Sequence, residues 1–181
     1  MTGSTQKFSR RKFHQAGAAA ALATTAASYQ AIAQGPNDMI RLGVIGVANR
    51  GSQLISAFGE CSNCQVVALC DVDSDALAKA NDQLGGNVDT YADFRQLIER
   101  NDIDGVVIAT PDHWHAIQMI EASHAGKDVY VEKPLSITVV EGRRMVEVAR
   151  QNKTIVQVGT HRRSSPLYAA LAGRVQNDDF G

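Results

Sequence analysis

A hexapeptide with glycine at both ends directly follows the apolar run Ile40–Ile45 of this 181-residue sequence. Gly46-Val47-Ala48-Asn49-Arg50-Gly51 matches the pattern G-x-G-x-x-G, with Ala48 in place of the second glycine. In that pattern the first glycine allows a tight turn, the second lets the backbone approach a pyrophosphate, and the third lets helix and strand pack closely. Free N–H groups and the positive end of a helix near Gly51 would receive the phosphates. The methyl group of Ala48 moves the expected pyrophosphate position slightly outward.

An aspartate stands where the next apolar run ends. Asp71 lies 25 residues after Gly46 and could accept hydrogen bonds from the adenosine ribose of a nicotinamide dinucleotide. Its charge would repel the additional phosphate of NADP, so NAD is the expected cofactor. Arg50 keeps NADP open, since a guanidinium near the ribose could accommodate a 2′-phosphate. The alternative role of Asp71 is a polar turn, whereas Asp73 is expected to cap a helix.

Two further polar segments follow apolar runs. Thr110-Pro111-Asp112-His113-Trp114-His115 follows one run, and Glu132-Lys133-Pro134 follows the next. The carboxyl ends of parallel strands face the ligand crevice in open α/β sheets, so both segments are candidate site residues. A surface ion pair of little energetic value is the alternative for Glu132 and Lys133.

The elements that must position these residues alternate along the chain. Short β-branched runs and longer helical patterns predict an α/β fold with a doubly wound parallel sheet. Strands are predicted at Ile40–Ile45, Gln65–Cys70, Gly105–Ala109, Asp128–Val131 and Thr154–Val158, with a weak one at Val88–Tyr91. Helices are predicted at Gly51–Glu60, Ser74–Leu84, Ala92–Arg100, His115–Ala125, Val139–Gln151 and Pro166–Gln176.

The N-terminal 33 residues read as a signal peptide. Ser9-Arg10-Arg11-Lys12-Phe13 matches the twin-arginine pattern, a weakly apolar run extends from Ala16 to Ala27, and Ala31-Ile32-Ala33 offers a cleavage site. We therefore expect residues 1–33 to direct export through the twin-arginine machinery to the periplasm or beyond, and residues 38–181 to form the nucleotide-binding domain. A disordered basic tail is the alternative.

Charge and cysteine content narrow the function further. The whole chain has a formal charge of -1, and removal of the four basic residues of the first 33 leaves 14 basic and 19 acidic residues, a net charge of -5. This balance argues against nucleic acid as a partner, and no metal site is predicted. Cys61 and Cys64 could form a local disulfide, remain inert thiols or act in redox chemistry, whereas Cys70 is expected in the core.

These motifs together resemble the Gfo/Idh/MocA oxidoreductases, the family of glucose-fructose oxidoreductase and inositol 2-dehydrogenase. The specific part is E-K-P after a strand end that reads T-P-x-x-x-H. The resemblance extends over the glycine loop, Cys70-Asp71-Val72-Asp73, Thr110-Pro111 with His115, Glu132-Lys133-Pro134 and Val158-Gly159-Thr160-His161-Arg162-Arg163. Exported members of this family also carry twin-arginine signals.

The resemblance implies NAD(P)-dependent oxidation or reduction of a sugar, a polyol or a related hydroxyl compound. Lys133 would be the catalytic lysine, Glu132 would help to position it, and a cis bond would precede Pro134. Thr110, Pro111 and His115 would line the cofactor crevice, while Trp114, His161 and Arg162 would contact cofactor or substrate.

The resemblance also implies a second, sheet-containing α+β domain, which we expect this chain to lack, and a homo-oligomeric full-length protein. Two alternatives remain open at this point. One is an NAD-dependent glycosidase of related fold, and the other is a non-catalytic NAD-binding fragment.

Overall fold

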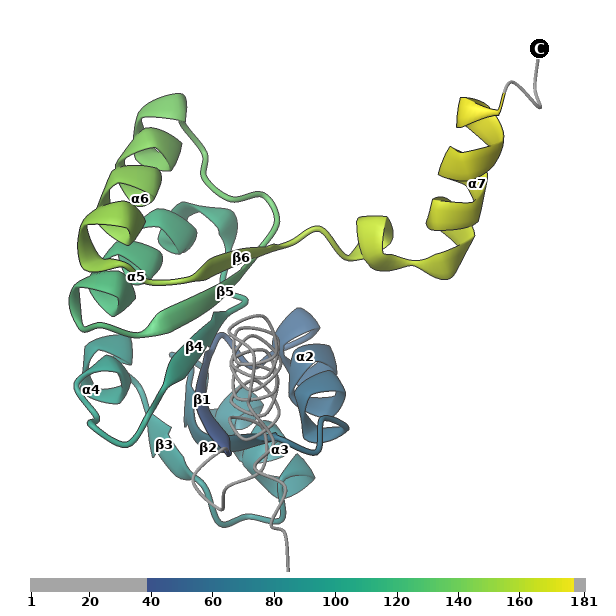
Figure 1. Ribbon diagram of the computed structural model, residues 1–181. Coiled ribbons are helices and arrows are strands. Elements are labelled where there is room, and N and C mark those ends of the chain that lie inside the picture. The colour runs from purple at the N-terminus through teal and green to yellow at the C-terminus, as the bar shows by residue number, and fades with distance from the viewer. Residues whose placement is uncertain (1–38, 178–181) are drawn as a thin grey trace, which may run out of the picture. The chain divides into compact units, whose positions relative to one another are not determined.

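A six-stranded parallel sheet forms the centre of the structure, a computed structural model that describes residues 39–177 (Figure 1). The predicted signal peptide lies outside the described residues. In chain order the strands are β1 (Ile40–Ile45), β2 (Cys64–Cys70), β3 (Asp89–Tyr91), β4 (Gly105–Ile108), β5 (Asp128–Glu132) and β6 (Val156–Gly159). Their spatial order is β3-β2-β1-β4-β5-β6, so the direction of winding reverses between β1 and β4. The predicted doubly wound sheet is confirmed, and ligands of such sheets bind at this reversal.

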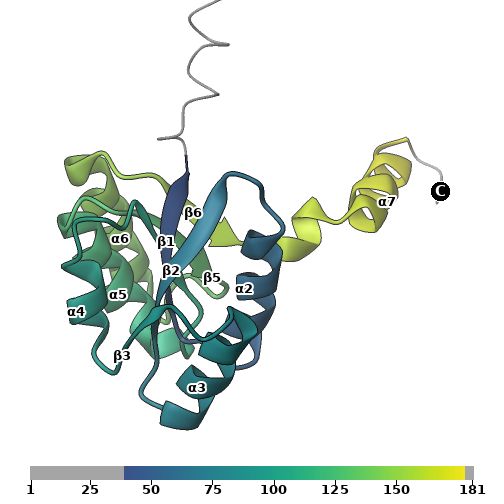
Figure 2. The ribbon, with the colours of Figure 1, turned by 90° about the horizontal axis from the view of Figure 1, so that it is seen from below.

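Helices cover both faces of the sheet (Figure 2). One face carries α2 (Arg50–Gly59) and α3 (Ser74–Gln83), and the other carries α4 (Phe94–Ile98), α5 (Asp112–His124) and α6 (Val139–Asn152). Side chains of strand β4 alternate between the two hydrophobic cores. Val107 packs against α2 and α3, whereas Val106 and Ile108 pack in the core that includes α4, α5 and α6. This alternation buries every residue of the strand.

Side-chain caps set several of the helix starts. Asp73 accepts from the backbone N–H groups of Asp75 at 2.9 Å and Ala76 at 3.2 Å, which confirms it as the cap of α3. Thr138 and Glu141 form a reciprocal capping box at the start of α6. Hydrogen bonds from the backbone of Thr138 and Ile137 lower the pKa of Glu141.

Two predicted helix starts differ from the observed ones by two residues or more. Helix α5 starts at Asp112 rather than His115, and the carboxylate of Asp112 suits the positive end of the helix. Helix α4 starts at Phe94 rather than Ala92, since Asp93 caps it by accepting from the N–H of Arg95. The first correction moves His113 and Trp114 from a loop into the first turn of α5, ahead of His115.

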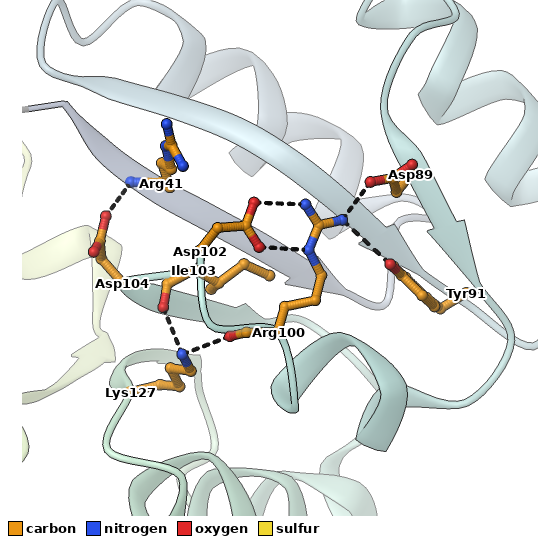
Figure 3. A network of polar contacts seen from close by, with 8 residues as sticks. All are labelled: Arg41, Asp89, Tyr91, Arg100, Asp102, Ile103, Asp104 and Lys127. Carbon is orange, nitrogen blue, oxygen red and sulfur yellow. Dashed lines mark hydrogen bonds and ion pairs between the residues drawn. The ribbon is translucent and has the colours of Figure 1, made fainter.

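A polar network joins the loops at the amino ends of the strands, remote from the ligand edge (Figure 3). The guanidinium of Arg100 pairs with Asp89 at 2.6 Å and with Asp102 at 2.7 Å, and it donates to the Tyr91 hydroxyl at 3.2 Å. The hydrogen bond from Arg100 lowers the pKa of Asp102 to about 2. These contacts connect the start of β3 to the loop that follows α4.

The side chain of Lys127 is hydrogen-bonded to the same loop, which connects α4 to β4. Its side chain is 9% exposed, and its ammonium donates to the carbonyl oxygens of Arg100 and Ile103, each at 2.7 Å. Both carbonyls lie outside regular elements, so the lysine supplies the donors that secondary structure would supply elsewhere. The lysine therefore links the start of β5 to the loop that leads into β4.

We predict that Lys127→Met destabilises the protein by about 2–4 kcal/mol, because the buried carbonyl of Ile103 and the half-buried carbonyl of Arg100 lose their donor at once. Urea unfolding followed by circular dichroism measures the change. Lys79→Met, at an exposed position of α3, is the matched control and is expected to change stability by less than about 0.5 kcal/mol. Equal stability of the two variants would contradict the role assigned to Lys127.

The chain continues past β6 into η1 (His161–Ser164) and α7 (Pro166–Gln176), which extend away from the sheet (Figure 1). The predicted last helix is confirmed, and none of its residues is buried. Between residues 39 and 177, the structure contains no helix long and apolar enough to span a membrane.

Candidate nucleotide-binding site

A crevice of about 700 Å³ opens at the carboxyl ends of β1, β2 and β4. Its walls are formed by the glycine loop after β1, by Asp71–Asp73 after β2, by residues 92–95 after β3, and by residues of the β4–α5 connection. This volume falls within the ordinary range for small-molecule and cofactor sites. The crevice therefore lies at the reversal of winding, where the sequence predicted it.

Two glycines of the loop are required by close contacts. Gly46 has a φ of +82°, and a Cβ there would lie 2.7 Å from the backbone carbon of Ala109 and from the backbone nitrogen of Thr110. A Cβ on Gly51 would collide with the carbonyl oxygen of Gly46. Asn49 also has a positive φ, at +36°, which a residue other than glycine seldom adopts. The loop is thus held in a conformation that brings the first turn of α2 against β1, with N–H groups available to an anion.

Asp71 holds the glycine loop to the end of β2. One carboxylate oxygen accepts from the N–H of Val47 at 2.9 Å, and the other accepts from the N–H of Asp73 at 3.1 Å. A carboxylate offers about four acceptor positions, so capacity remains for ribose hydroxyls. The side chain is half-buried in the crevice wall, in the position predicted for the ribose-binding acid.

Arg50 is directed toward β5 rather than toward Asp71. Its Nε donates to Glu132 Oε1 at 2.7 Å, and its Nη1 donates to Gln53 Oε1 at 2.9 Å. In the strand order, β2 and β5 lie on opposite sides of the β1–β4 pair. The guanidinium is thus engaged away from the expected ribose position, which removes the main argument for NADP.

The E-K-P segment occupies the carboxyl end of β5. Glu132 is 4% exposed, and its Oε2 accepts from the backbone N–H of Lys133 at 3.2 Å. The Lys133 side chain is exposed, and the bond between Lys133 and Pro134 is cis, as predicted. The buried Glu132 carboxylate is therefore hydrogen-bonded to the backbone of Lys133, whose ammonium is accessible to solvent.

The crevice wall after β4 contains Thr110, Pro111 and Trp114. Trp114 packs edge-on against Phe94, with ring centroids 6.4 Å apart, and is 42% exposed. Trp114 and Asp71 both line this crevice, whereas Lys133 does not. This placement puts Trp114 at the adenosine half of the crevice rather than beside the candidate catalytic lysine.

His115 does not lie on the crevice wall. It is 1% exposed, with Nδ1 2.7 Å from the carbonyl oxygen of Pro134 and Nε2 2.8 Å from that of Thr110. The prediction that it lines the crevice is therefore replaced by a bracing role between the β4 and β5 strand ends. The reason is the earlier start of α5, which turns His115 toward the core.

Two other predicted substrate residues are not brought to the crevice. His161 and Arg162 belong to η1 and are exposed, and the Arg162 guanidinium lies 5.8 Å from the ring centroid of Tyr168 in α7. Neither contributes to the crevice wall. In the described chain they form a separate surface beyond β6.

Sequence reasoning missed part of the crevice. Gln118 accepts from the Thr110 hydroxyl at 2.7 Å, and Phe94 and Arg95 form the wall after β3, with the Arg95 guanidinium 4.5 Å from the Phe94 ring centroid. Gln118 lies four residues after Trp114, so helical periodicity could have identified it once α5 was given its correct start.

The cysteines are free thiols within the described chain. Cys70 is buried as expected, and burial raises its pKa to about 12. Burial also raises the pKa of Cys64, which lies at the amino end of β2 and thus opposite the crevice. A raised pKa disfavours the reactive thiolate, which favours the inert-thiol interpretation for Cys64.

Fold and crevice together define a dinucleotide-binding Rossmann domain. A family model described as an oxidoreductase family with an NAD-binding Rossmann fold matches residues 40–160. The chain belongs to this family, Gfo/Idh/MocA, as the sequence motifs predicted. The family description and a solved neighbour with bound NAD(H) also confirm the prediction that the cofactor is NAD.

Named relatives match over most of the chain. It is 34% identical over 168 residues to glycosyl hydrolase family 109 protein 2 of Shewanella sp. strain ANA-3, covering 78% of this chain and 37% of that protein. It is 29% identical over 144 residues to inositol 2-dehydrogenase of Salmonella typhimurium strain LT2, covering 78% and 43%. The chain thus spans about two fifths of the length of these relatives.

Solved structures of inositol dehydrogenases share the fold. The myo-inositol 2-dehydrogenase of Lactobacillus plantarum matches with a TM-score of 0.73 at 30% identity, over 79% of this chain and 42% of that chain. The scyllo-inositol dehydrogenase of Lactobacillus casei, solved with NAD(H) and scyllo-inositol, matches with a TM-score of 0.72 at 26% identity, over 79% and 42%.

We predict that Gly51→Ala weakens NAD⁺ binding by about tenfold or more, since displacing α2 costs at least one hydrogen bond to a charged phosphate. Isothermal titration calorimetry measures the Kd. Gly59→Ala is the matched control in the same helix, because a Cβ at that position meets no atom within 4 Å. Wild-type affinity in Gly51→Ala would show that the loop does not hold the pyrophosphate.

Proposed function

We propose that this chain is the cofactor-binding part of an NAD-dependent oxidoreductase that acts on a polyol or sugar hydroxyl group. The observation that carries the proposal is the exposed Lys133 on a buried, paired Glu132, at the same sheet edge as the dinucleotide crevice. Relatives and solved neighbours named as inositol dehydrogenases support this substrate class.

The residues present fit a nicotinamide dinucleotide. The start of α2 and the glycine loop would hold the pyrophosphate, and Asp71 would hold the adenosine ribose. The nicotinamide half would then extend to the other side of β1, over β4 and β5. When bound, the cofactor supplies a hydride acceptor or donor.

Lys133 would provide the proton chemistry. An ammonium at the carboxyl end of β5 can donate a hydrogen bond to the reacting substrate oxygen and assist movement of its proton. Glu132 cannot serve that purpose directly, because it is buried and engaged by Arg50. Its function is to hold the strand end that presents the lysine.

NAD is preferred over NADP on electrostatic grounds. Asp71 is the carboxylate nearest the expected ribose, and the Arg50 guanidinium is engaged on the opposite side of β1. A 2′-phosphate would therefore meet a negative charge without a compensating cation from Arg50.

The test is a spectrophotometric assay of NADH formation by the purified protein with NAD⁺ and a panel of inositols and aldoses. We expect Lys133→Met to bind NAD⁺ like the wild type while its kcat falls by about 10²- to 10⁴-fold, the usual contribution of a general acid or base. Lys79→Met, on the exposed face of α3, is the control for loss of a lysine. Unchanged turnover in Lys133→Met would contradict the assignment.

Glycoside cleavage is the second candidate activity. It is favoured by the 34% identity to a protein named as a glycosyl hydrolase of family 109. The same panel should therefore include aryl glycosides. Release of the aryl group without net NADH formation would support this candidate over the dehydrogenase.

We also propose export through the twin-arginine machinery to the periplasm or the cell exterior. Its support is the order of sequence features, namely the twin-arginine motif at Ser9–Phe13, the small-residue run and the A-x-A site. That route carries folded proteins, which suits a domain that binds a cytoplasmic cofactor.

A further inference from the structure

The Glu132 carboxylate is enclosed by residues from three separate parts of the chain. Arg50, in the first turn of α2, donates to its Oε1 at 2.7 Å, and the hydroxyl of Tyr130 on β5 lies 3.4 Å from the same oxygen. Gly159 on β6 forms the third side, where a Cβ would lie 2.7 Å from the Tyr130 hydroxyl and 2.9 Å from Oε1. A larger residue at position 159 would therefore displace the Tyr130 hydroxyl or the Glu132 carboxylate.

Arg50 is the charged partner of this carboxylate. The side chain of Glu132 is 6% exposed and that of Arg50 is 35% exposed, so one charge is buried while the other reaches solvent. The pair raises the pKa of Arg50, chiefly through the hydrogen bond to Glu132. Tyr130 contributes a neutral hydroxyl, and β6 contributes Gly159, which has no ionisable group. The enclosed pair is therefore close to electrically neutral.

The pair also joins the two halves of the site. Arg50 directly follows the loop that is expected to hold the pyrophosphate, and Glu132 accepts from the N–H of Lys133 at 3.2 Å. With adenosine at Asp71, directly after β2, and the pyrophosphate at α2, the nicotinamide ring would extend toward β5. That ring carries a positive charge in NAD⁺ and none in NADH, so it responds to any net charge at the end of β5.

We propose that Arg50 is a positioning residue that holds the Glu132 carboxylate and neutralises it, and that this neutral pair sets the relative affinity of the site for NAD⁺ and NADH. The inference rests on the proposed function. It assigns Arg50 to the redox end of the cofactor rather than to the ribose phosphate considered from sequence.

Opposite charge changes are expected to shift this relative affinity in opposite directions. Arg50→Met leaves an uncompensated carboxylate, which favours the positively charged ring of NAD⁺ over NADH. Glu132→Gln leaves an uncompensated guanidinium, which favours NADH. We expect one uncompensated charge near the nicotinamide ring to change the ratio of the two Kd values by roughly three- to tenfold. The double variant, again without net charge, is expected to return the ratio toward the wild-type value.

The experiment measures Kd for NAD⁺ and for NADH by titration calorimetry in the wild type, both single variants and the double variant, with circular dichroism to verify folding. Arg144→Met is the matched control, because it removes an arginine from an exposed ion pair with Glu147 on α6. It is expected to leave both Kd values unchanged. Arg50→Lys retains the positive charge and is expected to retain the wild-type ratio of the two Kd values. If Arg50→Met does not fold, the comparison of Arg50→Lys with Glu132→Gln tests the inference instead.

A purely structural role of the pair would weaken the binding of both cofactor forms equally, and that result in folded single variants overturns the inference. A shift of both single variants in the same direction overturns it as well. Failure of the wild-type chain to bind either form would instead overturn the proposed function, so the two failures are distinguishable.

Discussion

The contact between Gly51 and the carbonyl oxygen of Gly46 is the constraint on which the site depends. Because no side chain separates them, the start of α2 lies directly against the end of β1, and the positive end of that helix points into the crevice. The same contact fixes Arg50, the first residue of α2, within reach of Glu132 on β5. A displaced α2 would therefore disturb both the phosphate-binding loop and the strand end that carries Lys133.

Electrostatics divides the crevice into two ends. Asp71 places an unpaired negative charge at the end near β2, where its oxygens also secure the N–H groups of Val47 and Asp73. At the end near β5, Glu132 is also negative but is neutralised by Arg50. The Asp71 end thus disfavours the 2′-phosphate of NADP, and at the β5 end the buried carboxylate is paired with Arg50 next to the exposed Lys133.

The sequence predicted the sheet, its winding and the glycine loop because these follow from local patterns, such as apolar runs and the position of Gly46. It also placed Asp71 and the E-K-P segment at the correct edge, since parallel strand ends share one edge. Arg50 and His115 were assigned differently because their roles depend on distant partners, Glu132 and Pro134, which lie 82 and 19 residues away along the chain. Gly159 was noted in the sequence only as part of the segment from Val158 to Arg163, and its place beside the Glu132 carboxylate became visible only in the structure.

The most direct test of this account is a crystal structure of the chain with NAD⁺. The account predicts the pyrophosphate at the N-terminus of α2, the adenosine ribose hydrogen-bonded to Asp71, and the nicotinamide ring over the end of β5, near Glu132 and Lys133. A nicotinamide ring over β2, or a pyrophosphate that does not contact the glycine loop, would contradict it.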